Sequence, residues 1–175
     1  MPTTLMPDSP VPALSVETVG GGQWTLSDQN PDLFTMVVFY RGYHCPVCKS
    51  YLLNVQSLVD AYADAGVSII AISMDDAERA GKSVDEWGLQ NLTVGYGLSQ
   101  ADARAWGLYV SKGINDVEAQ IFNEPGFFWI RPDGRLYLAD VSNMPWGARP
   151  DPEFLLSKIP VVVERQYPAR GTYAG

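Results

Sequence analysis

The stretch TMVVFYRGYHCPVC at residues 35–48 joins a run of β-branched and aromatic residues to two cysteines. Residues 35–40 show no alternation of apolar and polar positions, which is typical of a strand buried on both faces of a sheet. From Pro46 to about residue 65, apolar residues recur at steps of three and four, the periodicity of an amphipathic helix. The stretch therefore predicts a buried strand, a short loop and a helix, with Cys45 where the loop meets the helix.

The segments on either side of this unit predict further strands and helices. The predicted order is an extended arm at 1–13, a β-hairpin at 14–26, the strand at 35–40, the helix at 46–65, a strand at 67–72, a helix at 75–87, a short helix at 99–106, an antiparallel strand pair at 126–141, a helix at 152–165 and a tail at 167–175. We expect residues 144–146 to form a loop near the cysteines. This order predicts a single α/β domain over residues 1–175, in which a central mixed sheet is flanked by helices in a thioredoxin-like arrangement, with the N-terminal hairpin as an extension.

Composition and charge limit the classes of partner. The chain has 175 residues, 46% of them hydrophobic, which suffices for one well-buried core. A formal net charge of −8 argues against binding to nucleic acid or to an anionic membrane surface. The longest apolar runs are far shorter than the roughly 20 residues that cross a bilayer. The first residues lack a basic segment followed by an apolar one, so we expect a cytoplasmic protein.

The two cysteines, Cys45 and Cys48, are the only ones in the chain. Their spacing is too short for a bridge that ties distant parts of a fold together, so the pair indicates chemistry. At a helix N-terminus, with Pro46 next in sequence, unpaired amides and the helix dipole stabilise the Cys45 thiolate. Such positions lower a cysteine pKa from about 8.5 to between ~3.5 and ~7.5. Cys48 lies one turn further on, where its thiol can displace a mixed disulfide from Cys45 without any cofactor.

Other interpretations of these residues remain open at this point. His44, Cys45 and Cys48 are candidate zinc ligands, although a structural zinc site needs a fourth. The cysteines could also be two inert buried residues. His44 is a candidate base or cation beside Cys45, or a solvated loop residue. Arg41 is a candidate for stabilising the thiolate by its charge, or a surface residue.

The segment FYRGYHCPVC at residues 39–48 resembles the peroxiredoxin-like members of the alkyl hydroperoxide reductase and thiol-specific antioxidant family, within the thioredoxin superfamily. The resemblance extends over most of the chain, through residues 24–26, 73–75, 105–108 and 132–134. It implies a thioredoxin-like fold, an antioxidant oxidoreductase activity and a tendency to form homodimers.

The chain departs from the motif of this family. Peroxiredoxins carry Pro-x-x-x-Thr-x-x-Cys after the strand, and this pattern places Arg41 at the proline, Cys45 at the threonine and Cys48 at the peroxidatic cysteine. The arginine that completes the family's peroxide pocket falls at about Pro125. What stands here instead resembles thioredoxin, namely Cys-Pro-x-Cys and a proline before a strand. The resemblance implies a cis Glu124–Pro125 bond that faces the cysteines; an ordinary trans proline is the alternative.

These observations predict a thiol–disulfide oxidoreductase in which Cys45 attacks and Cys48 resolves. Its partners are a protein or small-molecule disulfide and a cellular thiol reductant. Residues expected to tune the thiolate or position the substrate are Arg41, His44, Pro46 and Pro125. Two alternatives are kept: a thiol peroxidase in which Cys48 attacks a hydroperoxide and Cys45 resolves, and a non-catalytic module that binds a partner or a metal.

Overall fold

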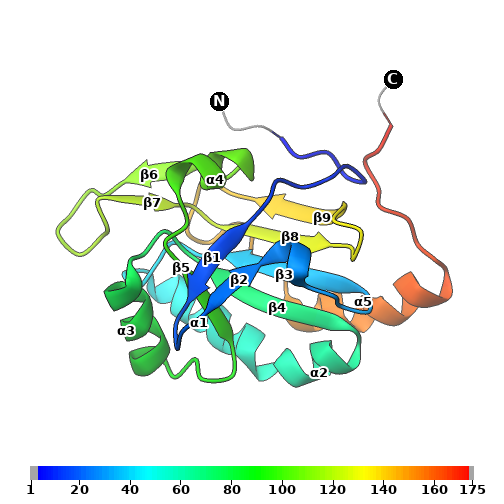
Figure 1. Cartoon of the computed structure of the whole chain (residues 1–175), viewed down its shortest axis with the longest axis horizontal. Coiled ribbons are helices and arrows are strands. Elements are labelled where there is room, and N and C mark those ends of the chain that lie inside the picture. The colour runs from blue at the N-terminus through cyan, green and yellow to red at the C-terminus, as the bar shows by residue number, and fades with distance from the viewer. Residues whose placement is uncertain (1–3, 174–175) are drawn as a thin grey trace.

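The computed structural model describes residues 4–173 (Figure 1). Its strands are β1 (Ser15–Thr18), β2 (Gln23–Thr25), β3 (Phe34–Phe39), β4 (Val67–Ile72), β5 (Thr93–Tyr96), β6 (Val110–Lys112), β7 (Ile121–Asn123), β8 (Gly126–Ile130) and β9 (Leu136–Val141). Its helices are α1 (Pro46–Ser57), α2 (Val59–Asp64), α3 (Ala77–Trp87), α4 (Gln100–Ala105) and α5 (Pro152–Glu164), with a 3-10 turn at Leu26–Asp28. No helix in this part of the chain is long and apolar enough to cross a membrane.

Seven strands form one mixed sheet in the order β2-β1-β5-β4-β3-β8-β9. Strand β3 lies inside the sheet, parallel to β4 and antiparallel to β8. All six of its residues are buried, as the unbroken apolar run predicts. The predicted central mixed sheet is confirmed. The loop that leads to the cysteines follows β3 and therefore starts from the interior of the sheet.

Helices cover both faces of this sheet. On one face, α1, α2, α3 and α5 contribute to a core around the aromatic residues Tyr40 and Trp129. On the other face, α4 and the N-terminal arm pack around Trp106 and Phe128, together with side chains of the edge strands β1 and β2. Figure 1 shows the β1–β2 hairpin crossing in front of the central strands, with α4 at the top of the view and α2 at the bottom. Because the sheet is fixed from both sides, the ends of β3, β4 and β8 form a rigid platform for the site.

Two features differ from the sequence-based expectation. The helix predicted at 46–65 is interrupted at Leu58 (φ −109°, ψ 3°), which divides it into α1 and α2. Strand β5 and the β6–β7 pair were not predicted. Strand β5 contains Gly95 at a point where β1 packs closely against it. A Cβ at this position would lie only 2.6 Å from Val16 Cγ2, so a larger residue would clash. The position of β5 is fixed by pairing with β1 and β4 rather than by a pattern of its own.

The N-terminal arm and the C-terminal tail both run beside β9. The Asp8 amide donates to the Leu136 carbonyl at 2.8 Å, and the Leu136 amide donates to Ser9 at 3.0 Å. The C-terminal tail contacts the same strand, because the Tyr137 hydroxyl donates to the Tyr167 carbonyl at 3.0 Å. The predicted arm and tail also included residues 1–3 and 174–175, which lie outside the described residues.

Candidate active site

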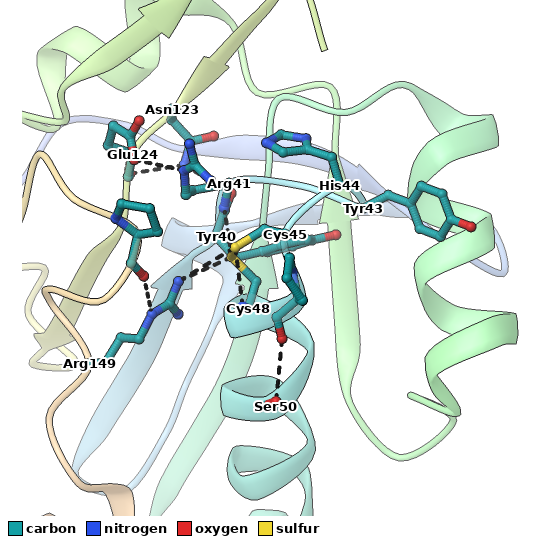
Figure 2. The surroundings of a disulfide bond; sticks show 12 residues. Tyr40, Arg41, Tyr43, His44, Cys45, Cys48, Ser50, Asn123, Glu124 and Arg149 are labelled. Atoms are coloured by element: carbon teal, nitrogen blue, oxygen red, sulfur yellow. Dashed lines mark hydrogen bonds and ion pairs between the residues drawn. A yellow bond between two sulfur atoms is a disulfide. The ribbon is translucent and has the colours of Figure 1, made fainter. Parts of the chain in front are cut away.

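Cys45 and Cys48 form a disulfide at the N-terminus of α1 (Figure 2). Cys45 is the N-cap residue, and its Sγ accepts a hydrogen bond from the Cys48 amide at 3.2 Å. Pro46 occupies the first helical turn. An N–H at this position has no partner within the helix, so proline loses no hydrogen bond there. The predicted position of Cys45 at the start of a helix is therefore confirmed. Both residues are almost fully buried, at 1% and 0% exposure, so a substrate must approach closely to reach either sulfur.

The Cys48 sulfur is contacted by two further donors. The Arg41 amide donates to Cys48 Sγ at 3.4 Å, and Arg149 Nη2 donates to it at 3.1 Å. The same Arg149 nitrogen is 4.0 Å from Cys45 Sγ. Burial lowers the pKa of Arg149, but a guanidinium stays charged at neutral pH. The arrangement therefore stabilises negative charge on Cys48 by a cation and an amide, and on Cys45 by the helix N-terminus.

Arg149 reaches the disulfide from the loop that follows β9. Its Nε donates to the Pro145 carbonyl at 2.6 Å, and its guanidinium lies over the Tyr51 ring at 5.4 Å. The Tyr51 hydroxyl donates to the Pro150 carbonyl at 2.7 Å, which ties the loop to α1. Figure 2 shows Arg149 approaching the sulfurs from the side away from His44. The sequence predicted a loop near the cysteines at 144–146 but missed Arg149 itself.

The Arg41 side chain points away from the sulfurs and into an ion-pair network. Its Nε donates to Glu124 Oε2 at 2.8 Å, and its Nη2 lies 3.5 Å from Glu118 Oε1. Glu124 also accepts from the Ser111 hydroxyl at 2.7 Å, and its side chain is only 5% exposed. Because two carboxylates offset the guanidinium charge, Arg41 acts on the disulfide mainly through its backbone amide. Its side chain instead ties the β6–β7 pair to the cysteine loop.

His44 is a neutral ring packed among cations. Its Nδ1 lies 3.2 Å from Arg79 Nη2, and its ring packs edge-on against Phe122 at 4.6 Å. Burial, followed by the charges of Arg41 and Arg79, lowers the pKa of His44 to about 4, against a smaller opposing effect of Glu118. At neutral pH the ring is therefore uncharged. A role as a cation that stabilises the Cys45 thiolate, which the sequence had suggested, does not fit this environment.

This environment predicts a pH dependence of folding. Between pH 6.5 and 4 the unfolded chain binds a proton at His44 that the folded chain does not, so stability falls as the pH is lowered through this window. Allowing for the half-buried ring, we expect a loss of about 1 to 3 kcal/mol. Urea unfolding of the wild type and a His44→Asn variant at pH 7, 5.5 and 4 measures it. Between pH 7 and pH 4, the free energy of unfolding should fall more in the wild type than in the variant. An equal fall in both proteins would contradict the prediction.

Gly42 allows the loop to lie directly against a buried carboxylate. Its φ is +124°, and a Cβ there would be 2.7 Å from Asp75 Oδ1. Asp75 Oδ2 accepts from the Tyr43 amide at 2.7 Å, and Asp75 Oδ1 accepts from Arg79 Nε at 3.0 Å. Burial raises the pKa of Asp75, while these two donors oppose the rise. Asp75 thus fixes residues 41–44 in the conformation that directs the Arg41 amide at Cys48.

The prediction of a cis Glu124–Pro125 bond is wrong, because no peptide bond within residues 4–173 is cis. The neighbouring backbone groups are paired in an extended conformation. The Glu124 amide donates to Tyr109 at 2.8 Å, and the Ser142 amide donates to the Pro125 carbonyl at 3.1 Å. A trans bond satisfies this pairing and is the intrinsically preferred isomer. Pro125 still borders the site, since the next residue, Gly126, pairs with Phe39 at the end of β3.

The described residues do not support the zinc alternative. Between residues 4 and 173, no group of three or more His, Cys, Asp or Glu side chains is placed to hold a metal ion. The Cys45 and Cys48 sulfurs are bonded to each other, and the His44 Nδ1 faces Arg79. In the structure, both sulfurs are therefore engaged in the disulfide.

A sequence model described as the AhpC/TSA family matches residues 7–139. None of the curated proteins matches the sequence significantly. Among solved structures, the chain is similar to peroxidoxin BcpB from Mycobacterium tuberculosis, with a TM-score of 0.74 and 14% identity over 91% of this chain and 99% of that one. It is also similar to a peroxiredoxin-like protein from Aquifex aeolicus, with a TM-score of 0.72 and 17% identity over 93% and 90% of the two chains.

A third similar structure is described as a thiol:disulfide interchange protein DsbE, from Chlorobium tepidum. Its TM-score is 0.66, with 19% identity over 91% of this chain and 98% of that one. At these identities the three structures establish a shared fold, and the thioredoxin-like arrangement predicted from the order of the elements is confirmed.

Proposed function

Because this chain belongs to the AhpC/TSA family, we propose that it is a thiol–disulfide oxidoreductase that acts through Cys45 and Cys48 in the reducing cytoplasm. The family makes the chain a cysteine-based oxidoreductase; the order of the steps and the substrate are our proposal. One observation carries it: Cys45 caps α1, and its sulfur is bonded to that of Cys48, one helical turn further on.

The first half of the reaction reduces a substrate disulfide. The Cys45 thiolate attacks one substrate sulfur, and the other leaves as a thiolate that takes a proton. The Cys48 thiolate then attacks Cys45 Sγ, the second substrate sulfur leaves, and the Cys45–Cys48 bond forms. The substrate gains two electrons from the cysteine pair, and its two thiolates take their protons from the solvent. The Arg149 guanidinium, 3.1 Å from Cys48 Sγ, supports this step by keeping Cys48 ionised.

The second half resets the protein. A cellular thiol attacks Cys45 Sγ as a thiolate, and Cys48 leaves as a thiolate. A second reductant thiol then releases the mixed disulfide. A thiol with a lower pKa leaves faster, so Arg149 and the Arg41 amide, which both contact Cys48 Sγ, support this step as well. Arg149 and the Arg41 amide thus stabilise the Cys48 thiolate both when the disulfide forms and when it is reduced.

One observation favours a second candidate, a thiol peroxidase. Cys48 stands at the position that resembles the peroxidatic cysteine, and it carries the closer contact to Arg149. In this reaction the Cys48 thiolate attacks the terminal oxygen of a hydroperoxide, which releases an alcohol and leaves a sulfenic acid on Cys48. The Cys45 thiolate then attacks Cys48 Sγ, water leaves, and the same disulfide forms. Both candidates end in one oxidised product, so the substrate must distinguish them.

The test compares two oxidants on one protein. The fully reduced chain is mixed with a disulfide-bonded peptide or with hydrogen peroxide, and free thiols are alkylated and counted by mass over time. We expect the disulfide to oxidise the pair at least about tenfold faster, a difference of about 1.4 kcal/mol in activation free energy. A Cys45→Ser/Cys48→Ser double variant, which has no thiol left, gives the background of the alkylation measurement. Faster oxidation by peroxide would establish the second candidate instead.

A further inference from the structure

A cavity lies away from the disulfide, along the β9 edge of the sheet. It has a volume of about 850 Å³ and follows β9 between α5 with the tail on one side and the N-terminal arm on the other. We call it the β9 groove. Its walls include Leu5, Trp106, Phe128, Tyr137, Leu155 and Val162. The size is that of a small-molecule site, and neither cysteine lines it.

Both ends of the described chain help to build this groove. The N-terminal arm contributes Leu5 and Pro7, and the tail contributes Pro168 and Arg170. A Cβ added to Gly171 would lie 3.5 Å from Pro7 Cγ, so the tail passes close to the arm. Figure 1 shows them passing close together beside β9. The groove is therefore an assembled feature of the folded chain rather than a gap within one element.

The charge of the groove is opposite to that of the protein. The chain as a whole has 20 acidic and 12 basic residues. Among residues 4–173, however, no aspartate or glutamate lines the groove, and the charged side chains that line it are Lys158 and Arg170. Neither cation takes part in an ion pair among the described residues. Lys158 lies over the Phe154 ring at 4.6 Å, and Arg170 lies over the Tyr167 ring at 5.9 Å. An apolar groove with two cations lacking carboxylate partners is complementary to a ligand that is apolar along its length and anionic at one end.

We propose that the β9 groove binds a single-chain amphipathic anion of the long-chain carboxylate class. The hydrocarbon chain lies along the apolar side chains, and the carboxylate faces the wall that carries Lys158 and Arg170. Anionic lipid surfaces and nucleic acids remain disfavoured by the net charge of −8, whereas a monomeric ligand in a groove is exposed mainly to the local charge. Binding in the β9 groove does not require the reaction of the cysteines.

Calorimetric titration with dodecanoate below its micelle concentration tests the proposal. We expect one saturable site per chain, and a change in fluorescence because Trp106 and Trp129 line the groove. Affinity should increase from octanoate to dodecanoate by up to about fourfold per methylene. Dodecyltrimethylammonium, which has the same chain and the opposite charge, should bind at least about tenfold more weakly. Equal binding of the two amphiphiles, or no saturable binding of dodecanoate, would overturn the proposal.

A pair of charge variants locates the site. Lys158→Glu/Arg170→Glu should weaken dodecanoate binding at least about tenfold, whereas Lys49→Glu/Lys112→Glu, which changes the net charge equally at exposed residues outside the groove, should leave it within about twofold. Ala139→Trp, at an exposed lining position on β9, should block binding while the thermal unfolding midpoint shows that the fold is intact. Equal loss in both charge variants, or sedimentation showing that a second copy of the chain occupies the groove, would overturn the assignment.

Discussion

Replacing Cys48 with serine is expected to abolish turnover with a disulfide substrate, by about a thousandfold or more, while leaving one half-reaction intact. Cys45 keeps its position at the helix N-terminus, so its thiolate still attacks the substrate. The serine hydroxyl cannot displace the sulfur, and a mixed disulfide on Cys45 accumulates. Intact mass should increase by the mass of one substrate half, and dithiothreitol should reverse the increase.

The matched control is Cys45→Ser. This variant keeps Cys48 with its two donors, Arg149 and the Arg41 amide, but removes the attacking sulfur. We expect no mixed disulfide under the same conditions. If Cys45→Ser forms the adduct and Cys48→Ser does not, Cys48 is the attacking residue and the proposed order of the two steps is wrong.

Replacing Arg149 with methionine is expected to have the second largest effect on the chemistry. Its Nη2 is 3.1 Å from Cys48 Sγ, and removal of a cation at this distance raises the pKa of the reduced Cys48 thiol, so that less thiolate is present at pH 7. A more basic thiolate is also a better nucleophile, which offsets part of the loss. The net result should be a displacement of the mixed disulfide that is slower by about three- to tenfold.

Two measurements separate this effect from a general loss of structure. The alkylation rate of Cys48, followed in the Cys45→Ser background against pH, should move to higher pH in Arg149→Met and return part of the way in Arg149→Lys. The Arg165→Met variant removes an arginine from the exposed end of α5, and its pH profile should match that of the wild type. Identical profiles for Arg149→Met and the wild type would show that Arg149 has no influence on the thiolate.

Local patterns in the sequence were enough to place the cysteines. The unbroken apolar run identified β3, the periodicity after Pro46 identified α1, and the junction between them placed Cys45 at a helix start. Each of these signals lies within a few residues of the element that it describes, so no knowledge of the tertiary structure was needed. The strand pair β8–β9 was recovered for the same reason, from the turn sequence at residues 131–134 that joins the two strands.

The groups that surround the sulfurs could not be found in this way. Arg149 is separated from Cys48 by 101 residues, and its contact depends on the loop after β9 folding back onto α1. The Arg41 side chain was a candidate for stabilising the thiolate because it is close to the cysteines in sequence. In the structure it instead forms an ion pair with Glu124, which is 83 residues away. The trans bond at Pro125 likewise follows from partners on other strands. Contacts made across the sheet leave no periodic signature in the sequence.

The hydrogen bond from the Arg41 amide to Cys48 Sγ belongs to the backbone, and every amino acid but proline can supply it. The family motif that the chain resembles has a proline at this position. A proline here would have no N–H to donate, so the departure from the motif is a gain of a donor as well as a loss of a motif residue. Selection on this contact would exclude one residue type and leave the other nineteen equivalent. As far as this contact is concerned, the residue at position 41 can change while the sulfur keeps its backbone donor, although the buried Glu124 would then lose its Arg41 partner. A comparison of side chains alone would overlook the backbone donor.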